Sequence, residues 1–87
     1  MISHTTAAFR KTYREMPENI RNRAQAAYRL FNENPNHPSL RFKQVHSVRQ
    51  IYSVRVTLGY RALAVREGDG IVWFWIGSHG DYEKLIS

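Results

Sequence analysis

Residues 51–76 read IYSVRVTLGYRALAVREGDGIVWFWI, and this stretch decides the fold of the 87-residue chain. Two segments within it, 51–58 and 60–67, are rich in β-branched and aromatic residues, which favour strands. Gly68-Asp69-Gly70 is a good hairpin signal. The segment 71–76 is apolar at every position, which is typical of a strand that is covered on both faces. We therefore predict successive strands joined by tight turns, with the last of them in the interior of the sheet.

Just before this stretch, the spacing of apolar residues changes from that of a helix to that of a strand. Asn34-Pro35-Asn36-His37-Pro38 ends a helical pattern, because prolines and asparagines interrupt helices and favour turns. After it, Leu40 and Phe42 alternate with Arg41 and Lys43. Alternation of apolar and polar residues predicts a half-buried strand, which adds a further strand to the sheet.

Helical periodicity dominates the part of the chain before Asn34. Phe9, Tyr13 and Met16 recur on one helical face, after a candidate N-cap at Thr5 or Thr6. Pro17 interrupts the pattern and is compatible with the first turn of a second helix. The apolar stripe of that second helix comprises Ile20, Ala24, Ala27, Tyr28 and Phe31. Two antiparallel helices are expected.

The C-terminal residues predict a short helix. Ser78-His79-Gly80-Asp81 resembles a capping box, followed by apolar positions at Tyr82, Leu85 and Ile86. The expected fold class is therefore α+β. An N-terminal helical hairpin packs on a twisted antiparallel sheet of about four strands, a short helix follows, and residues 1–87 form one domain.

The charge of the chain points to a negatively charged partner. Thirteen Lys and Arg residues stand against seven Asp and Glu, for a formal net charge of +6. Ten of the thirteen cations are arginines, whose forked guanidinium groups suit contacts with phosphate. Such a field attracts polyanions or an acidic protein. A solvated surface that only aids solubility is the simpler interpretation.

Other features of the sequence narrow the class of protein. There is no cysteine, and His4, His37 and His46 lack metal-ligand spacing, so we expect no disulfide, metal or cofactor. The N-terminal residues have no signal-peptide pattern, and no apolar run approaches the ~20 residues of a membrane span. A cytoplasmic protein without membrane contact is expected.

Three short motifs in this order resemble the RelE/ParE superfamily of bacterial toxins. They are Tyr52-Ser53-Val54-Arg55-Val56, Gly59-Tyr60-Arg61-Ala62-Leu63 and Trp75-Ile76-Gly77-Ser78-His79, and they follow a helical hairpin with a proline between its helices. The superfamily pattern has a tyrosine–x–x–basic strand, a Tyr-Arg at the start of the next strand, and a Gly-x-His or Gly-x-Arg before a tyrosine, here Tyr82. The resemblance covers nearly the whole chain.

The resemblance implies two different activities. In the RelE branch it implies cleavage of messenger RNA in the ribosomal decoding site without a metal. In the ParE branch it implies inhibition of DNA gyrase without nuclease activity. A basic binding domain of the same fold with no catalytic activity is a further alternative. In each case the partner that restrains the protein would be an acidic antitoxin.

Metal-free RNA cleavage requires a base for the 2′-hydroxyl, cations for the phosphate and an acid for the leaving oxygen. By resemblance, Arg61 is the arginine that stabilises the transition state. His79 coincides with the Gly-x-basic position, and histidine exchanges protons near neutral pH. Tyr82, one turn further on, would orient the RNA; its alternative is to pack the last helix onto the sheet. These residues are the candidate catalytic group.

Further cations are candidates for RNA binding. Arg55 lies at the position of a basic strand residue in RelE-like toxins, and Arg41 and Lys43 would contact phosphates beside Arg61. Exposed cations at a strand edge also deter aggregation, which is the structural alternative. Ser53 departs from the pattern, because some relatives carry a lysine there. The nuclease interpretation requires that the fold bring Arg61, His79 and Tyr82 together; a gyrase inhibitor has no such requirement.

Overall fold

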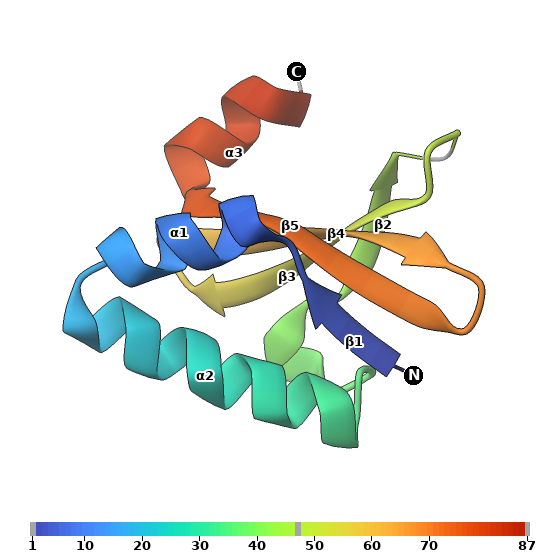
Figure 1. Cartoon of the computed structure of the whole chain (residues 1–87), viewed down its shortest axis with the longest axis horizontal. Helices are drawn as coiled ribbons and strands as arrows, with labels where there is room; N and C mark the ends of the chain where they lie inside the picture. Colours follow the sequence, from blue (N-terminus) through green and yellow to red (C-terminus); the bar gives the residue numbers. More distant parts are fainter. Residues whose placement is uncertain (1, 47, 87) are drawn as a thin grey trace.

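The computed structural model describes residues 2–46 and 48–86. The elements in chain order are β1 (Ile2–Thr5), α1 (Ala7–Glu15), α2 (Glu18–Glu33), the 3-10 helix η1 (Pro38–Leu40), β2 (Lys43–His46), β3 (Ile51–Thr57), β4 (Tyr60–Glu67), β5 (Gly70–Ser78) and α3 (His79–Ile86). The strands form one sheet in the order β1-β5-β4-β3-β2 (Figure 1). The α+β class and the short C-terminal helix are as predicted.

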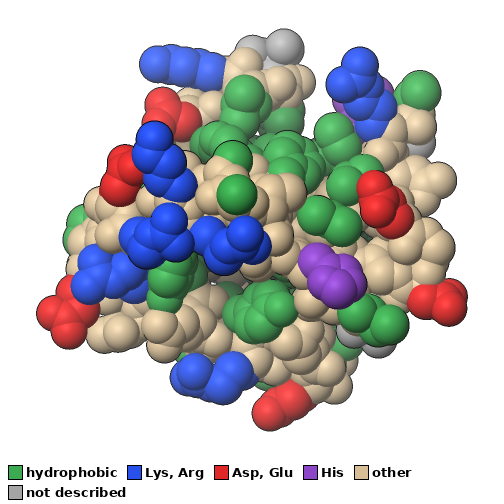
Figure 2. Space-filling model, in the orientation of Figure 1, with side chains coloured by type: hydrophobic (Ala, Val, Ile, Leu, Met, Phe, Trp, Pro, Cys, Tyr) green, Lys and Arg blue, Asp and Glu red, His purple; other side chains and the backbone are tan. Residues whose placement is uncertain are grey.

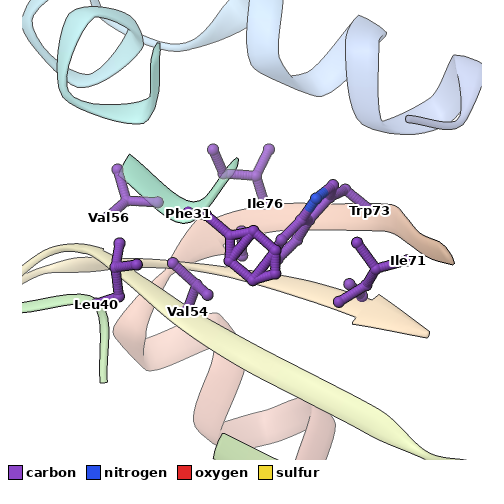
Figure 3. Close-up of a cluster of buried hydrophobic side chains, with 9 residues drawn as sticks. Phe31, Leu40, Val54, Val56, Ile71, Trp73 and Ile76 are labelled. Carbon is purple, nitrogen blue, oxygen red and sulfur yellow. The ribbon is translucent and has the colours of Figure 1, made fainter. Parts of the chain in front are cut away.

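Helices α1 and α2 pack on one face of the sheet and enclose the main core. Figure 3 shows the buried side chains between this helical layer and the strands, with α3 on the other side of the sheet. The core comprises Phe31, Leu40, Val54, Val56, Ala62, Ala64, Ile71, Trp73 and Ile76. Phe31 is its centre, since its ring makes edge contacts with Phe42 at 5.0 Å and Trp73 at 5.1 Å between centroids.

The helical hairpin begins and turns where the sequence predicts. The Thr6 hydroxyl accepts a hydrogen bond from the Phe9 N–H at 3.0 Å, which caps α1. Pro17 is the residue just before α2 and not part of its first turn. The predicted stripe of α2 faces the core with Ile20 and Phe31 buried, whereas Tyr28 is exposed.

Two predictions about the sheet were wrong. The sheet has five strands and is mixed, because β1 pairs in parallel with β5, from Ile2 beside Gly70 to Thr5 beside Trp73. Residues 40–43, in which apolar and polar side chains alternate, do not all belong to one strand. Leu40 ends η1 and is buried with 2% exposure, and β2 begins only at Lys43. Burial of Leu40 against the core explains its apolar character without a strand.

The two predicted tight turns are confirmed. β3 and β4 pair antiparallel, as do β4 and β5, and β5 lies inside the sheet between β1 and β4. A bulge shifts the register, so that Leu63 pairs with Trp75 but Ala64 pairs with Trp73. Strict alternation would place both tryptophans on one face. The bulge instead puts Trp73 in the core and Trp75 on the face of Leu63.

Among the described residues, no helix has the length and apolar character needed to cross a membrane.

Candidate functional site

The candidate site lies on the sheet face opposite α1 and α2. Val54, Val56 and Ala62 point into the main core, so the residues that alternate with them point to the other face. Arg55 pairs directly with Arg61 across β3 and β4, and Arg61 pairs with Gly77 of β5. Side chains that pair directly across antiparallel strands lie on the same face. The register therefore places both arginines side by side beneath α3.

Arg61 contacts two of the residues that the sequence singled out. Its Nε donates to Nδ1 of His79 over 3.4 Å, and its guanidinium carbon lies 5.3 Å from the centre of the Tyr82 ring. A guanidinium over an aromatic face at this distance forms a cation–π contact. The structure thus brings Arg61, His79 and Tyr82 to one place, although 18 residues separate Arg61 from His79.

His79 is held at the first position of α3. Its backbone N–H donates to the Gly59 carbonyl at 2.8 Å, which ties the start of α3 to the β3–β4 turn. The Ser78 hydroxyl accepts from the Asp81 N–H at 3.1 Å, as the predicted cap requires. The imidazole remains accessible, because 45% of the side chain is exposed.

Tyr82 lies beneath the other two residues. Only 4% of it is exposed, and its ring stacks against the His79 ring at 5.8 Å between centroids and 28° between planes. This burial leaves the ring little surface for a nucleobase, so the structure favours the packing role over direct contact with RNA. Tyr82 supports the positions of Arg61 and His79 from below.

Buried polar atoms without a partner gather on this face. Among the described residues, four buried side-chain atoms make no hydrogen bond. The Ser53 hydroxyl, Arg55 Nε and Arg61 Nη1 lie on this face, whereas Trp73 Nε1 lies in the main core. An unpaired buried donor costs free energy, and two like charges that face each other add to that cost. An anion bound beside the two guanidinium groups would relieve the repulsion between them. The two arginines therefore supply the charge and the donors that a phosphate group requires.

Ser53 is part of the same face at a position where some relatives carry lysine. It pairs with Lys43 on one side and Leu63 on the other, and it is fully buried. A lysine side chain at this position would have to extend beyond the side chains of Lys43 and Leu63 to reach solvent, whereas the short serine side chain is covered by them. The cation nearest in the register to Ser53 is Lys43, which is exposed at the start of β2.

The predicted RNA-binding cations do not all join the site. Arg55 does, because it pairs with Arg61. Lys43 is on β2, separated from β4 by β3, so strand spacing alone places it about 10 Å away. Arg41 is exposed, with a left-handed backbone at φ 49, before β2 begins. Lys43 therefore lies at the edge of the site, whereas among the described residues no strand pairing connects Arg41 with it.

One residue of the site is absent from the sequence-based prediction. Oε1 of Glu83 lies 3.0 Å from Nε2 of His79. The signal for this contact is the i,i+4 spacing on a helix, which brings two side chains together on one face. This spacing identifies Glu83 only after His79 has been placed on the helix.

The grouping resembles an acid–base site for phosphate chemistry. Two arginines supply positive charge, an accessible imidazole lies beside them, and a carboxylate contacts that imidazole. Among the described residues, no three His, Asp or Glu side chains come close enough to bind a metal ion.

Residues 18–84 match the family model described as a ParE-like toxin domain. A search of curated protein sequences finds no match to the chain.

Solved structures share the fold at low sequence identity. The toxin of the RelB–RelE antitoxin–toxin complex from Methanococcus jannaschii superposes with a TM-score of 0.75 at 19% identity, covering 97% of this chain and 99% of that chain. The YoeB/ParE toxin from Agrobacterium tumefaciens gives 0.72 at 13%, covering 91% and 99%. YafQ from Escherichia coli gives 0.68 at 11%, covering 92% and 94%. These structures confirm the RelE/ParE-like fold.

Proposed function

Because the chain belongs to the ParE-like toxin domain family of the RelE/ParE superfamily, we propose that it is a toxin that cleaves messenger RNA on the ribosome. The observation that carries this proposal is the contact of Arg61 with both His79 and Tyr82. A protein that acted only by binding gyrase would not need an exposed histidine beside an arginine pair.

The proposed reaction uses the 2′-hydroxyl of the RNA as the nucleophile. His79 accepts the 2′-hydroxyl proton, the 2′-oxygen bonds to the adjacent phosphorus, and the bond from phosphorus to the 5′-oxygen breaks. The leaving 5′-oxygen takes a proton from solvent, and the product carries a 2′,3′-cyclic phosphate that water opens to a 3′-phosphate. Arg55 and Arg61 stabilise the charge on the phosphate during the transfer. Tyr82 holds Arg61 and His79 in place, and Arg41 and Lys43 contact the RNA backbone further along the strand.

Expression of the protein followed by mapping of RNA ends tests this function in cells. The wild type should produce new 5′ ends within translated messages after brief induction in the cytoplasm. Arg61→Ala and His79→Ala should each lower the cleavage by 10²- to 10⁴-fold, which is the usual contribution of such groups. Arg23→Ala, on the exposed side of α2, serves as the control and should cleave normally. Equal toxicity of Arg61→Ala and the wild type would remove the mechanism.

Inhibition of DNA gyrase is the alternative, because the matching family is described as ParE-like and the resemblance to the ParE branch implies that activity. In that case cells that express the protein would accumulate cleaved DNA while their messages stay intact. The same induction experiment distinguishes the two functions, because DNA breaks and RNA ends are measured in parallel samples. Cleaved DNA with unchanged RNA ends would assign the gyrase function and would leave His79→Ala fully toxic.

An acidic antitoxin is the proposed protein partner. One groove between α1 and α2, with a volume of about 450 Å³, has Phe9, Tyr13 and Ala27 among its lining and Arg10 and Arg29 at its edges. Figure 2 shows Lys and Arg side chains around hydrophobic ones on this helical face. An amphipathic helix with acidic flanks matches this surface in both polarity and charge.

The antitoxin contact has a direct test on the toxin side. Ala27→Glu places a negative charge in the groove and should weaken the copurification of the acidic protein encoded next to the toxin gene. Glu33→Gln changes charge at the end of the same helix, outside the groove, and is the control. Unchanged copurification of Ala27→Glu would place the antitoxin elsewhere on the toxin.

A further inference from the structure

Glu83 contacts the candidate base of the site from the side opposite to Arg61. Nε2 of His79 lies 3.0 Å from Oε1 of Glu83, and Nδ1 of the same ring lies 3.4 Å from Nε of Arg61. Both ring nitrogens of His79 therefore have a partner in the protein. The identity of these partners decides which nitrogen carries the proton.

The two partners have opposite requirements. Nε of Arg61 always carries a hydrogen, so it can only donate, and Nδ1 of His79 must then offer its lone pair. An ionised Glu83 carboxylate can only accept, so Nε2 of His79 must carry a hydrogen. These two contacts are satisfied together only by the neutral imidazole with its hydrogen on Nε2.

We propose that Glu83 is a positioning residue that fixes this tautomer of His79 and so makes Nδ1 the nitrogen that accepts the 2′-hydroxyl proton. The proposal rests on the nuclease function above. Nδ1 is the nitrogen on the side of Arg61, where the phosphate would bind, whereas Nε2 faces the exposed Glu83 side chain. Once Nδ1 has accepted the proton, the carboxylate of Glu83 stabilises the imidazolium ion.

A second consequence concerns Arg61. Protonated Nδ1 becomes a donor and can no longer accept from Nε of Arg61, so the Arg61–His79 hydrogen bond must break when His79 gains the proton. The freed guanidinium then has one more N–H for the phosphate, at the stage when negative charge on the phosphate is greatest. Proton transfer and charge stabilisation are coupled through this single hydrogen bond.

Within residues 2–46 and 48–86, few charged and titratable groups face His79. They are Arg61 from β4 and Tyr82 and Glu83 from α3. Because Glu83 is 61% exposed at its side chain, its effect on the cleavage rate should be modest, about fivefold. The loss from His79→Ala should be far larger.

Nitrogen NMR of the ¹⁵N-histidine-labelled full chain tests the tautomer without any activity. In wild-type protein at a pH where the ring is neutral, we expect the signals of the Nε2–H form. Glu83→Ala should raise the share of the Nδ1–H form, because only the long 3.4 Å hydrogen bond from Arg61 then favours the Nε2–H form. Glu83→Gln should keep the Nε2–H form, because the amide oxygen still accepts, but lose about fivefold in cleavage by ribosomes programmed with messenger RNA. Asp81→Asn removes one charge from the same helix without touching His79 and should change neither the tautomer nor the rate.

The outcomes separate this proposal from the nuclease proposal. An Nδ1–H form in the wild type, or the same tautomer in Glu83→Ala, overturns the role of Glu83 even if RNA is cleaved. Absence of cleavage by the wild type overturns the nuclease function, and the NMR result then still decides whether Glu83 fixes the ring. A rate of Glu83→Gln equal to that of the wild type overturns the stabilisation of the imidazolium ion.

Discussion

Arg55 and Arg61 pair directly across β3 and β4, so two guanidinium groups project from neighbouring positions on one face. One nitrogen of each is buried without a hydrogen-bond partner. Like charges that face each other across strands destabilise the sheet. A bound anion would relieve this repulsion, and we therefore propose that the arginine pair binds one.

Arg55→Gln should therefore stabilise the free protein and weaken its response to anions. In low-salt buffer, the loss of a repulsion of about 0.2–1 kcal/mol should raise the melting temperature by about 1–8 °C. Added sulfate should stabilise the wild type more than this variant, because one of the donors is gone. Thermal unfolding followed by circular dichroism measures both effects. Arg23→Gln is the control for charge, and an equal sulfate response in all three proteins would contradict an anion site.

Gly77 is required by the position of Trp75. A Cβ atom on Gly77 would lie 2.5 Å from the Trp75 ring, whereas a Cβ on Gly59 would meet nothing within 4 Å. Gly77→Ala should therefore force the indole to move, with a loss of about 1–3 kcal/mol in the free energy of unfolding. Gly59→Ala should change that free energy by less than about 0.5 kcal/mol, as a surface substitution does. Urea unfolding with tryptophan fluorescence tests the pair, and equal losses would show that the close approach is unimportant.

The aromatic ring of Tyr82 should contribute more to stability and RNA cleavage than its hydroxyl group does. Tyr82→Ala removes a ring with 4% exposure and should cost about 3–5 kcal/mol of stability, while Tyr82→Phe keeps the support under Arg61. We expect the Phe variant to keep RNA cleavage within tenfold of the wild type. Leu85→Ala, on the same helix with 57% exposure, is the control for helix α3. A Phe variant without activity would assign the hydroxyl a chemical role.

Thr6→Ala should destabilise the protein by about 1 kcal/mol, because the hydroxyl of Thr6 accepts from the Phe9 N–H at the start of α1. Thr12→Ala, an exposed position within the same helix, should be neutral or slightly stabilising. The difference in urea midpoint between the two variants measures the cap. Equal midpoints would indicate that another group replaces the hydroxyl.

Local signals in the sequence predicted most of the fold. The Gly68-Asp69-Gly70 turn, the Thr6 cap and the start of α3 depend on residues within a few positions of one another, and all three are present. Strand β1 was missed because four residues with no apolar alternation become a strand only by pairing with β5, which is distant in sequence. The 3-10 helix Pro38–Leu40 was missed because Leu40 is apolar for burial in the core, which produces the same apolar–polar pattern as a half-buried strand.

The sequence predicted which residues belong to the site better than it predicted the contacts between them. The motifs identify Arg55, Arg61, His79 and Tyr82, but the pairing of the two arginines depends on a register that shifts between Arg55 and Thr57. The burial of Tyr82 depends on how α3 turns back onto the sheet. Glu83 has no motif of its own, and only the helical geometry after His79 reveals it.

Strand β1 has a practical consequence for work with this protein. The Ile2 N–H donates to the Asp69 carbonyl, so Ile2 lies beside the β4–β5 turn. β5 then runs from that turn to His79, a length of about 30 Å for nine residues. An affinity tag or fluorophore attached at the N-terminus would therefore sit far from the candidate site, whereas one attached after α3, the helix that carries His79 and Tyr82, would lie closer to it. A label at the N-terminus should therefore leave binding measurements undisturbed, whereas a label after α3 should disturb them.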